Sequence, residues 1–151
     1  MAETTLKPQL QSDMKTSMKS GDKKRLGIIR LILSAIKQIE VDERIELDDS
    51  RVISVLDKMA KQRRESIALF TTAARDDLIA IEQDELKVIQ EYLPEPLSEA
   101  EINSLIEQSI TSTGAASIRE MGKVMGILKP QLQGRADMGK VSQLIKSRLS
   151  S

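Results

Sequence analysis

The segment Leu93-Pro94-Glu95-Pro96-Leu97-Ser98 constrains the fold more than any other part of this sequence. Proline has no backbone N–H and holds the preceding residue in an extended conformation, so two prolines in three residues exclude a continuous helix. Ser98 and Glu101 match the capping-box pattern that begins a helix. The segment 94–98 therefore predicts a proline-rich linker between an N-terminal domain, residues 1–93, and a C-terminal domain, residues 99–151.

Apolar residues recur at helical spacing in four segments before this linker. They run from Leu6 to Ser20, from Asp22 into the acidic stretch 40–49, from Arg51 to Phe70, and from Arg75 to about Tyr92. In the third segment we expect the following side chains to point inward: Val52, Val55, Leu56, Met59, Ile67 and Phe70. Short connections between such helices are typical of an antiparallel four-helix bundle.

Three shorter helices are expected after the linker, over about 99–112, 118–129 and 138–149. Phe70 and Tyr92 are the only aromatic residues in the chain, so both cores must be built from aliphatic side chains and methionine. This composition is typical of helical proteins and not of β-sandwiches. The predicted fold is all-α. A C-terminal domain of this size is marginal alone, and we expect it to dock on the bundle or on a partner.

A glycine-rich corner is predicted between the last two helices. Gly122 and Gly126 lie four residues apart, on one helix face, and would let another backbone approach closely. Pro130 is expected to end that helix at about Lys129, Gly134 to turn the chain, and Asp137 to cap the last helix. The simplest interpretation is a tight helix–helix corner whose cations are ordinary surface residues.

Composition excludes several classes of site. The chain has no His and no Cys, which removes the commonest general base, the thiol nucleophile and most transition-metal ligands. No catalytic residues, cofactor or metal are expected. No apolar run approaches the roughly 18 residues of a membrane span, and no signal peptide is recognisable, so we expect a cytoplasmic protein without a membrane partner. Charge is uneven: residues 76–107 carry ten acids and one lysine, and residues 108–151 carry seven cations and two acids.

The run GKVMGILKPQLQGRAD and the helix that follows it resemble the C-terminal signature of the GatB/YqeY family. Arg25 to Arg30, Lys61-Gln62-Arg63 and Glu91-Tyr92-Leu93-Pro94 look like the free-standing YqeY-like members, so the resemblance covers essentially the whole chain. The C-terminal part is similar to the tail domain of the B subunit of the glutamine-dependent aspartyl/glutamyl-tRNA amidotransferase. This resemblance implies a carbon–nitrogen ligase context with glutamine as amido donor, and tRNA contact by the tail. Stand-alone catalysis is not expected.

Two functions from different classes follow. The first is a tRNA-binding accessory protein that holds RNA through the cations Arg119, Lys123, Lys129, Arg135, Lys140 and Lys146. Because stacking aromatics are almost absent, recognition would rest on the RNA backbone and its shape. The second is a protein-interaction module that docks a partner through the acidic segment 76–107 or the glycine corner. Partners that are lost from the protein after ribonuclease treatment would favour the first.

Overall fold

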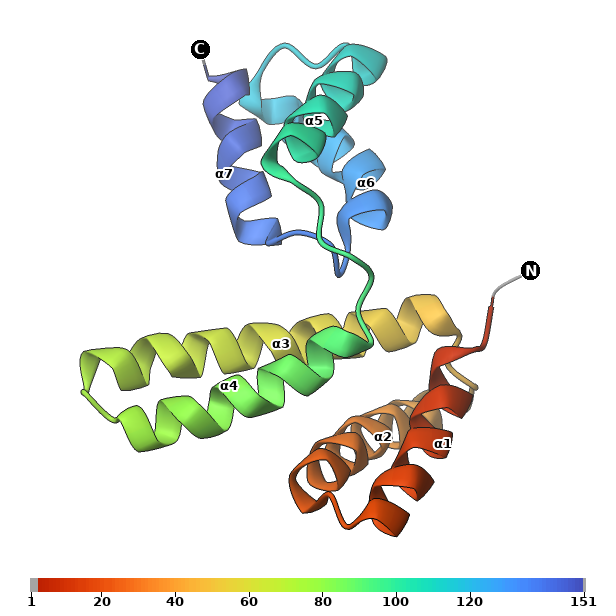
Figure 1. Ribbon diagram of the computed structural model, residues 1–151. Helices are drawn as coiled ribbons and strands as arrows, with labels where there is room; N and C mark the ends of the chain where they lie inside the picture. Colours follow the sequence, from red (N-terminus) through yellow and green to blue (C-terminus); the bar gives the residue numbers. More distant parts are fainter. Residues whose placement is uncertain (1–2, 151) are drawn as a thin grey trace. The chain divides into compact units, whose positions relative to one another are not determined.

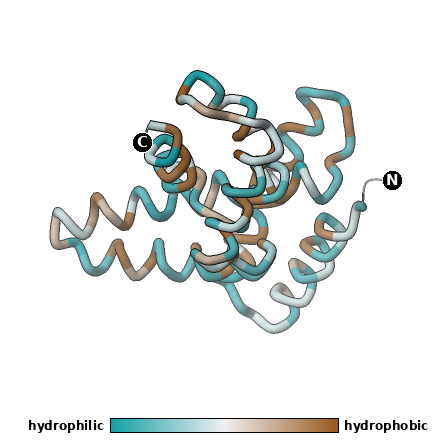
Figure 2. The backbone as a smooth tube through the Cα atoms, turned by 90° about the horizontal axis from the view of Figure 1, so that it is seen from above, coloured by the Kyte–Doolittle hydropathy of each residue, from teal (hydrophilic) through white to brown (hydrophobic). Residues whose placement is uncertain are grey.

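The computed structural model describes residues 3–150, and these form seven α-helices and one short 3₁₀ helix without a strand. The predicted all-α fold is confirmed. The chain divides into two compact units between Leu93 and Pro94: unit 1 ends at Leu93 and unit 2 begins at Pro94. Figure 2 shows apolar and polar residues alternating along the helices, as expected when each helix buries one face.

Unit 1 consists of two helical hairpins. Its helices are α1 (Leu6–Ser20), α2 (Lys23–Glu43), α3 (Asp49–Thr72) and α4 (Asp76–Glu91). Helix α1 lies beside α2, and α4 lies beside α3 along most of the length of α4 (Figure 1). Helix α2 also contacts both α3 and α4. Helix α2 is therefore central, as its densely apolar sequence predicts.

The boundaries of these helices follow from local chemistry. Gly21 ends α1 in the left-handed conformation, with a φ of 74°, which glycine adopts without steric cost. Asp22 caps α2 by accepting a hydrogen bond from the backbone N–H of Arg25, and Asp48 caps α3 in the same way from Arg51. Helix α3 continues past Phe70 to Thr72, two residues further than the sequence predicts.

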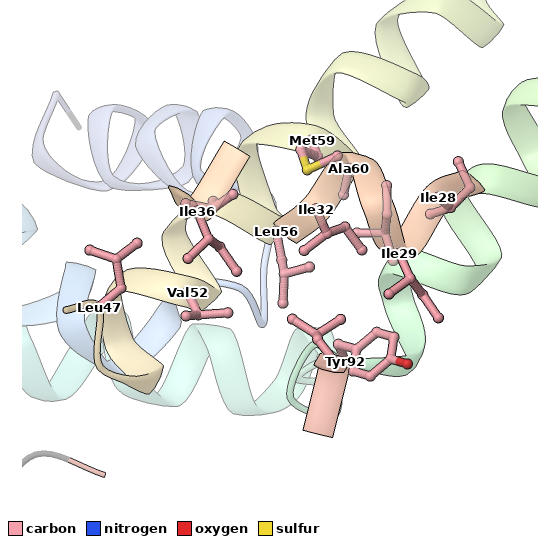
Figure 3. Packing of buried hydrophobic residues seen from close by; sticks show 13 residues of the cluster. Ile28, Ile29, Ile32, Ile36, Leu47, Val52, Leu56, Met59, Ala60 and Tyr92 are labelled. Carbon is pink, nitrogen blue, oxygen red and sulfur yellow. The ribbon is translucent and has the colours of Figure 1, made fainter. Parts of the chain in front are cut away.

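The core of unit 1 is aliphatic, and Tyr92 is its single aromatic member. Ile29, Ile32, Leu56 and Ile89 have no exposed surface, and the ring of Tyr92 packs beside this group (Figure 3). The buried residues of α3 run only from Val52 to Ala60. The outer part of the α3–α4 hairpin is therefore more open than predicted: Ile67 and Phe70 are half-buried and do not belong to the buried core of unit 1.

Unit 2 contains α5 (Glu99–Thr113), the 3₁₀ helix η1 (Ile118–Glu120), α6 (Met121–Leu132) and α7 (Met138–Leu149). Its fully or almost fully buried side chains come from all three α-helices: Ile106, Val124, Leu128, Leu132, Val141, Ile145 and Leu149. The predicted capping box is present, because Ser98 and Glu101 bond each other's backbone N–H groups. The linker is fastened to this unit by a hydrogen bond from the Leu97 N–H to the Arg135 carbonyl, at 2.9 Å.

The corner between α6 and α7 differs from the prediction in two respects. Pro130 does not end the helix at Lys129, because α6 continues to Leu132, whose completely buried side chain holds the last turn in place. Gly122 and Gly126 do not serve a close helix contact within residues 3–150: beyond the backbone of their own helix, no atom of these residues lies within 4 Å of the position that a Cβ would take. Gly134 turns the chain with a φ of 77°, and Asp137 caps α7 through the Gly139 N–H.

Candidate nucleic-acid interface

Unit 2 separates its charges by helix. Helices α6 and α7 together carry five cations and no acidic residue, whereas α5 carries three glutamates and no cation. The five basic residues are Lys123, Lys129, Lys140, Lys146 and Arg148. Charges that lie within about one Debye length, roughly 8 Å at physiological salt, reinforce each other, so this excess of cations should give α6 and α7 a positive potential.

Five of the six predicted RNA-binding cations are exposed. Arg119 lies in η1, Lys123 and Lys129 lie on α6, and Lys140 and Lys146 lie on α7. None of them makes an ion pair with another residue in the part of the chain that the structure describes. Their ammonium and guanidinium groups are therefore available to a polyanion without first breaking an internal contact.

Arg135, the sixth predicted cation, has a structural position. Its Nε donates a hydrogen bond to the carbonyl of Glu95 at 3.0 Å, and its own backbone accepts from Leu97 and donates to Leu132. The side chain is half-buried between the linker and the corner. Asp137 Oδ1 accepts from the Gly139 N–H at 2.9 Å and so occupies part of the α7 N-terminus. A phosphate site built on Arg135 and this helix end is therefore not favoured by the geometry.

The acidic segment 76–107 is divided between the two units. In unit 1 the carboxylates of α4 largely meet cations: Glu85 pairs with Arg63 at 3.2 Å, and Asp77 with Arg75 at 3.0 Å. Glu107, in unit 2, pairs with Arg148 at 2.9 Å. The strong negative charge of this segment along the sequence is thus partly neutralised in space.

A polar cluster in unit 1 was not foreseen from the sequence. The Tyr92 hydroxyl donates a hydrogen bond to Asp13 of α1 and accepts one from Arg25 of α2, whose guanidinium also pairs with Glu91. Burial raises the pKa of Tyr92, and the bond to Asp13 raises it further. A tyrosine with a raised pKa keeps its proton at neutral pH, so this cluster ties three helices together and does not supply a base.

This cluster joins residues that the family resemblance already singled out in separate segments, namely Arg25 and Glu91-Tyr92. That resemblance was the available signal, although it gave no indication that the residues touch. No group of three or more Asp or Glu residues suited to a metal ion occurs in residues 3–150. Within the same residues no helix has both the length and the apolar character to cross a bilayer.

The chain matches the family model of the YqeY-like proteins over residues 7–149. It is 33% identical over 136 residues to "Altered inheritance of mitochondria protein 41, mitochondrial" of Pyrenophora tritici-repentis, a match that covers 89% of this chain and 75% of the relative. The protein of the same name from Kluyveromyces lactis is 35% identical over 106 residues, 68% of this chain and 57% of the relative. The Saccharomyces cerevisiae protein is 30% identical over 124 residues, 78% of this chain and 66% of the relative.

These comparisons correct one expectation. The relatives are named as mitochondrial proteins, which contradicts the cytoplasmic location expected from the sequence. The expectation rested on the lack of a recognisable targeting segment, and composition alone does not assign a compartment. The match covers little more than half of the Kluyveromyces lactis relative.

Proposed function

We propose, from the premise that the chain belongs to the family of YqeY-like proteins, that it binds tRNA through the basic surface of α6 and α7. One observation carries the proposal: these two helices hold five cations and no acid, and the four lysines among them are exposed and unpaired within residues 3–150. The resemblance of the C-terminal sequence, GKVMGILKPQLQGRAD and the helix after it, to the tail domain of an amidotransferase B subunit favours tRNA as the ligand. We propose an accessory role beside such an enzyme, without a catalytic centre in this chain.

Recognition in this proposal is electrostatic. Phe70 and Tyr92 both belong to unit 1, so unit 2 has no aromatic ring on which a base could stack. Lysine ammonium groups are compact point charges that contact phosphate oxygens without reading base edges. The affinity should therefore depend steeply on salt and only weakly on the tRNA sequence.

The test is a salt titration of tRNA affinity. Lys123→Ala and Lys146→Ala should each weaken binding and reduce the slope of log affinity against log salt by roughly 0.7 to 0.9, the contribution of one phosphate contact. Lys87→Ala is the matched control, because Lys87 is an exposed lysine of α4 in the other unit. Equal losses for all three variants would contradict a defined surface, and absence of tRNA binding at low salt would overturn the proposal.

Arg135→Ala separates the two roles considered for that residue. If Arg135 only fastens the linker, its removal should lower the stability of unit 2 and leave the salt slope unchanged, since its guanidinium already bonds Glu95. A reduced slope with unchanged stability would instead restore Arg135 as a phosphate ligand.

A further inference from the structure

Unit 1 contains a groove that the proposed function does not use. It has a volume of about 530 Å³ and lies between the N-terminal part of α2 and the middle of α4. The residues that line it are Asp22, Lys23, Lys24, Arg25, Gly27, Ile28, Leu31, Ile81, Asp84, Glu85 and Val88.

The centre of the groove is apolar and partly exposed. Leu31 of α2 is 49% exposed and Ile81 of α4 is 54% exposed, so each wall carries a large aliphatic side chain that water still reaches. Gly27 adds open space to the α2 side of the groove, since among residues 3–150 nothing beyond its own helix backbone and chain neighbours lies within 4 Å of the position that its Cβ would take. Covering the two aliphatic side chains would remove apolar surface from water, which is favourable.

The two walls have opposite charge. Lys23 and Lys24 stand on the α2 side, and Asp84 and Glu85 stand on the α4 side. Glu85 is engaged with Arg63, and Arg25 with Glu91. Lys24 and Asp84 are only loosely paired, with Nζ and Oδ2 3.6 Å apart and side chains 87% and 61% exposed. An exposed pair of this kind contributes little to stability, so exchanging its partners costs little.

We propose that this groove is the surface through which two copies of the chain pair about a two-fold axis parallel to the groove. Such an axis places the basic wall of one copy against the acidic wall of the other, so that Lys24 faces the partner's Asp84 twice, and it covers Leu31 and Ile81 in both copies. The charge pattern of the groove is thus complementary to itself. The lining residues are fewer than the 20 to 30 per side of a standard interface, so the dimer is weak, with a Kd on the order of 10–100 μM.

The test uses sedimentation equilibrium of the full chain over a concentration series, with two reversed charges. Lys24→Glu alone and Asp84→Lys alone each put two like-charged pairs in the dimer and should weaken it at least about tenfold. In an equimolar mixture of the two variants, the mixed dimer contains one Glu–Lys pair and one Lys–Asp pair. Mixing should therefore restore the wild-type affinity within a few-fold.

The mixing step distinguishes the proposed contact from the internal one. If Lys24 and Asp84 matter only within one copy, each variant has lost that pair and mixing restores nothing, which would overturn the proposal. Lys58→Glu, at an exposed lysine of α3 outside the groove, is the control for net charge and should leave dimerisation unchanged. A wild-type chain that stays monomeric up to about 1 mM, a concentration well above the expected Kd, would also overturn it.

Discussion

Replacing Tyr92 with Phe tests the polar cluster that joins α1, α2 and the end of α4. Phenylalanine keeps the ring packing in the core but removes the hydroxyl that donates to Asp13 and accepts from Arg25 at 3.3 Å. A hydrogen bond to a charged group contributes about 1.5–3 kcal/mol, and the half-buried Asp13 can recover part of this from water. We expect a loss of about 2 kcal/mol in the unfolding free energy of unit 1, or roughly 8–16 °C in its Tm.

Thermal unfolding by circular dichroism measures this loss, and a double-mutant cycle with Asp13→Asn assigns it. Asparagine keeps an acceptor oxygen without the charge, so Tyr92→Phe should cost less in the Asp13→Asn background if the hydroxyl–carboxylate bond is the source. A cost below about 0.5 kcal/mol in the wild-type background, the range of ordinary surface changes, would refute this reasoning.

Tyr92 also gives the protein a direct optical reading of this cluster, because it is the only tyrosine and the chain has no tryptophan. Its pKa is raised by burial and by the bond to Asp13. A raised folded-state pKa gives stability that is present below the ordinary tyrosine value, near 10, and is lost as the pH rises above it. The tyrosinate absorbance should therefore appear together with the unfolding of unit 1. Ionisation near pH 10 with unchanged helical signal would contradict the buried hydrogen bond.

Two further outcomes are expected. Asp49→Ala should lower the unfolding free energy of unit 1 by about 1–2 kcal/mol, because the Asp49 carboxylate accepts hydrogen bonds from the N–H groups of Thr5 and Leu6 at the start of α1, both at 2.8 Å. Ser50→Ala is the control and should change the unfolding free energy little. Burial raises the pKa of Asp49, but these bonds outweigh it and lower the pKa. The effect of the substitution should thus be full above about pH 4 and vanish as the pH falls through the lowered pKa. Gly122→Ala and Gly126→Ala should each raise the unfolding free energy of unit 2 by up to about 1 kcal/mol, and so raise its Tm. A lower Tm for either variant would contradict the open space beside these glycines.

The elements that the sequence predicts best are those whose ends depend on one or two neighbouring residues. Helix α1 ends at Ser20 because Gly21 follows, and α7 begins at Met138 because Asp137 caps it; both segments have the predicted bounds. Pro130 shows the limit of this approach. Its effect on α6 is decided by the burial of Leu132, which depends on the position of α7 and α5 and not on the local sequence.

Contacts across long sequence separations account for the rest. Arg25 and Tyr92 lie 67 positions apart, and nothing in their local sequences indicates that their side chains meet. The same holds for Arg135, which the sequence presents as a free cation beside a helix end and the fold bonds to Glu95, 40 positions earlier. Side-chain type predicted the charge of the surface on α6 and α7, but only the fold separates cations that are engaged from those that are free.

The exposed glycines of α6 allow the RNA surface to be examined more closely than the lysines alone do. Two glycines in a helix cost about 1 kcal/mol each relative to alanine, and no side-chain packing against them within residues 3–150 offsets this cost. If a phosphate backbone approaches α6 closely between Lys123 and Lys129, an added methyl group at Gly126 should weaken tRNA binding while it stabilises the helix. The two effects would then have opposite signs in one variant. Unchanged tRNA affinity in a stabilised Gly126→Ala protein would instead place the contact at the ends of the lysine side chains, away from the helix backbone.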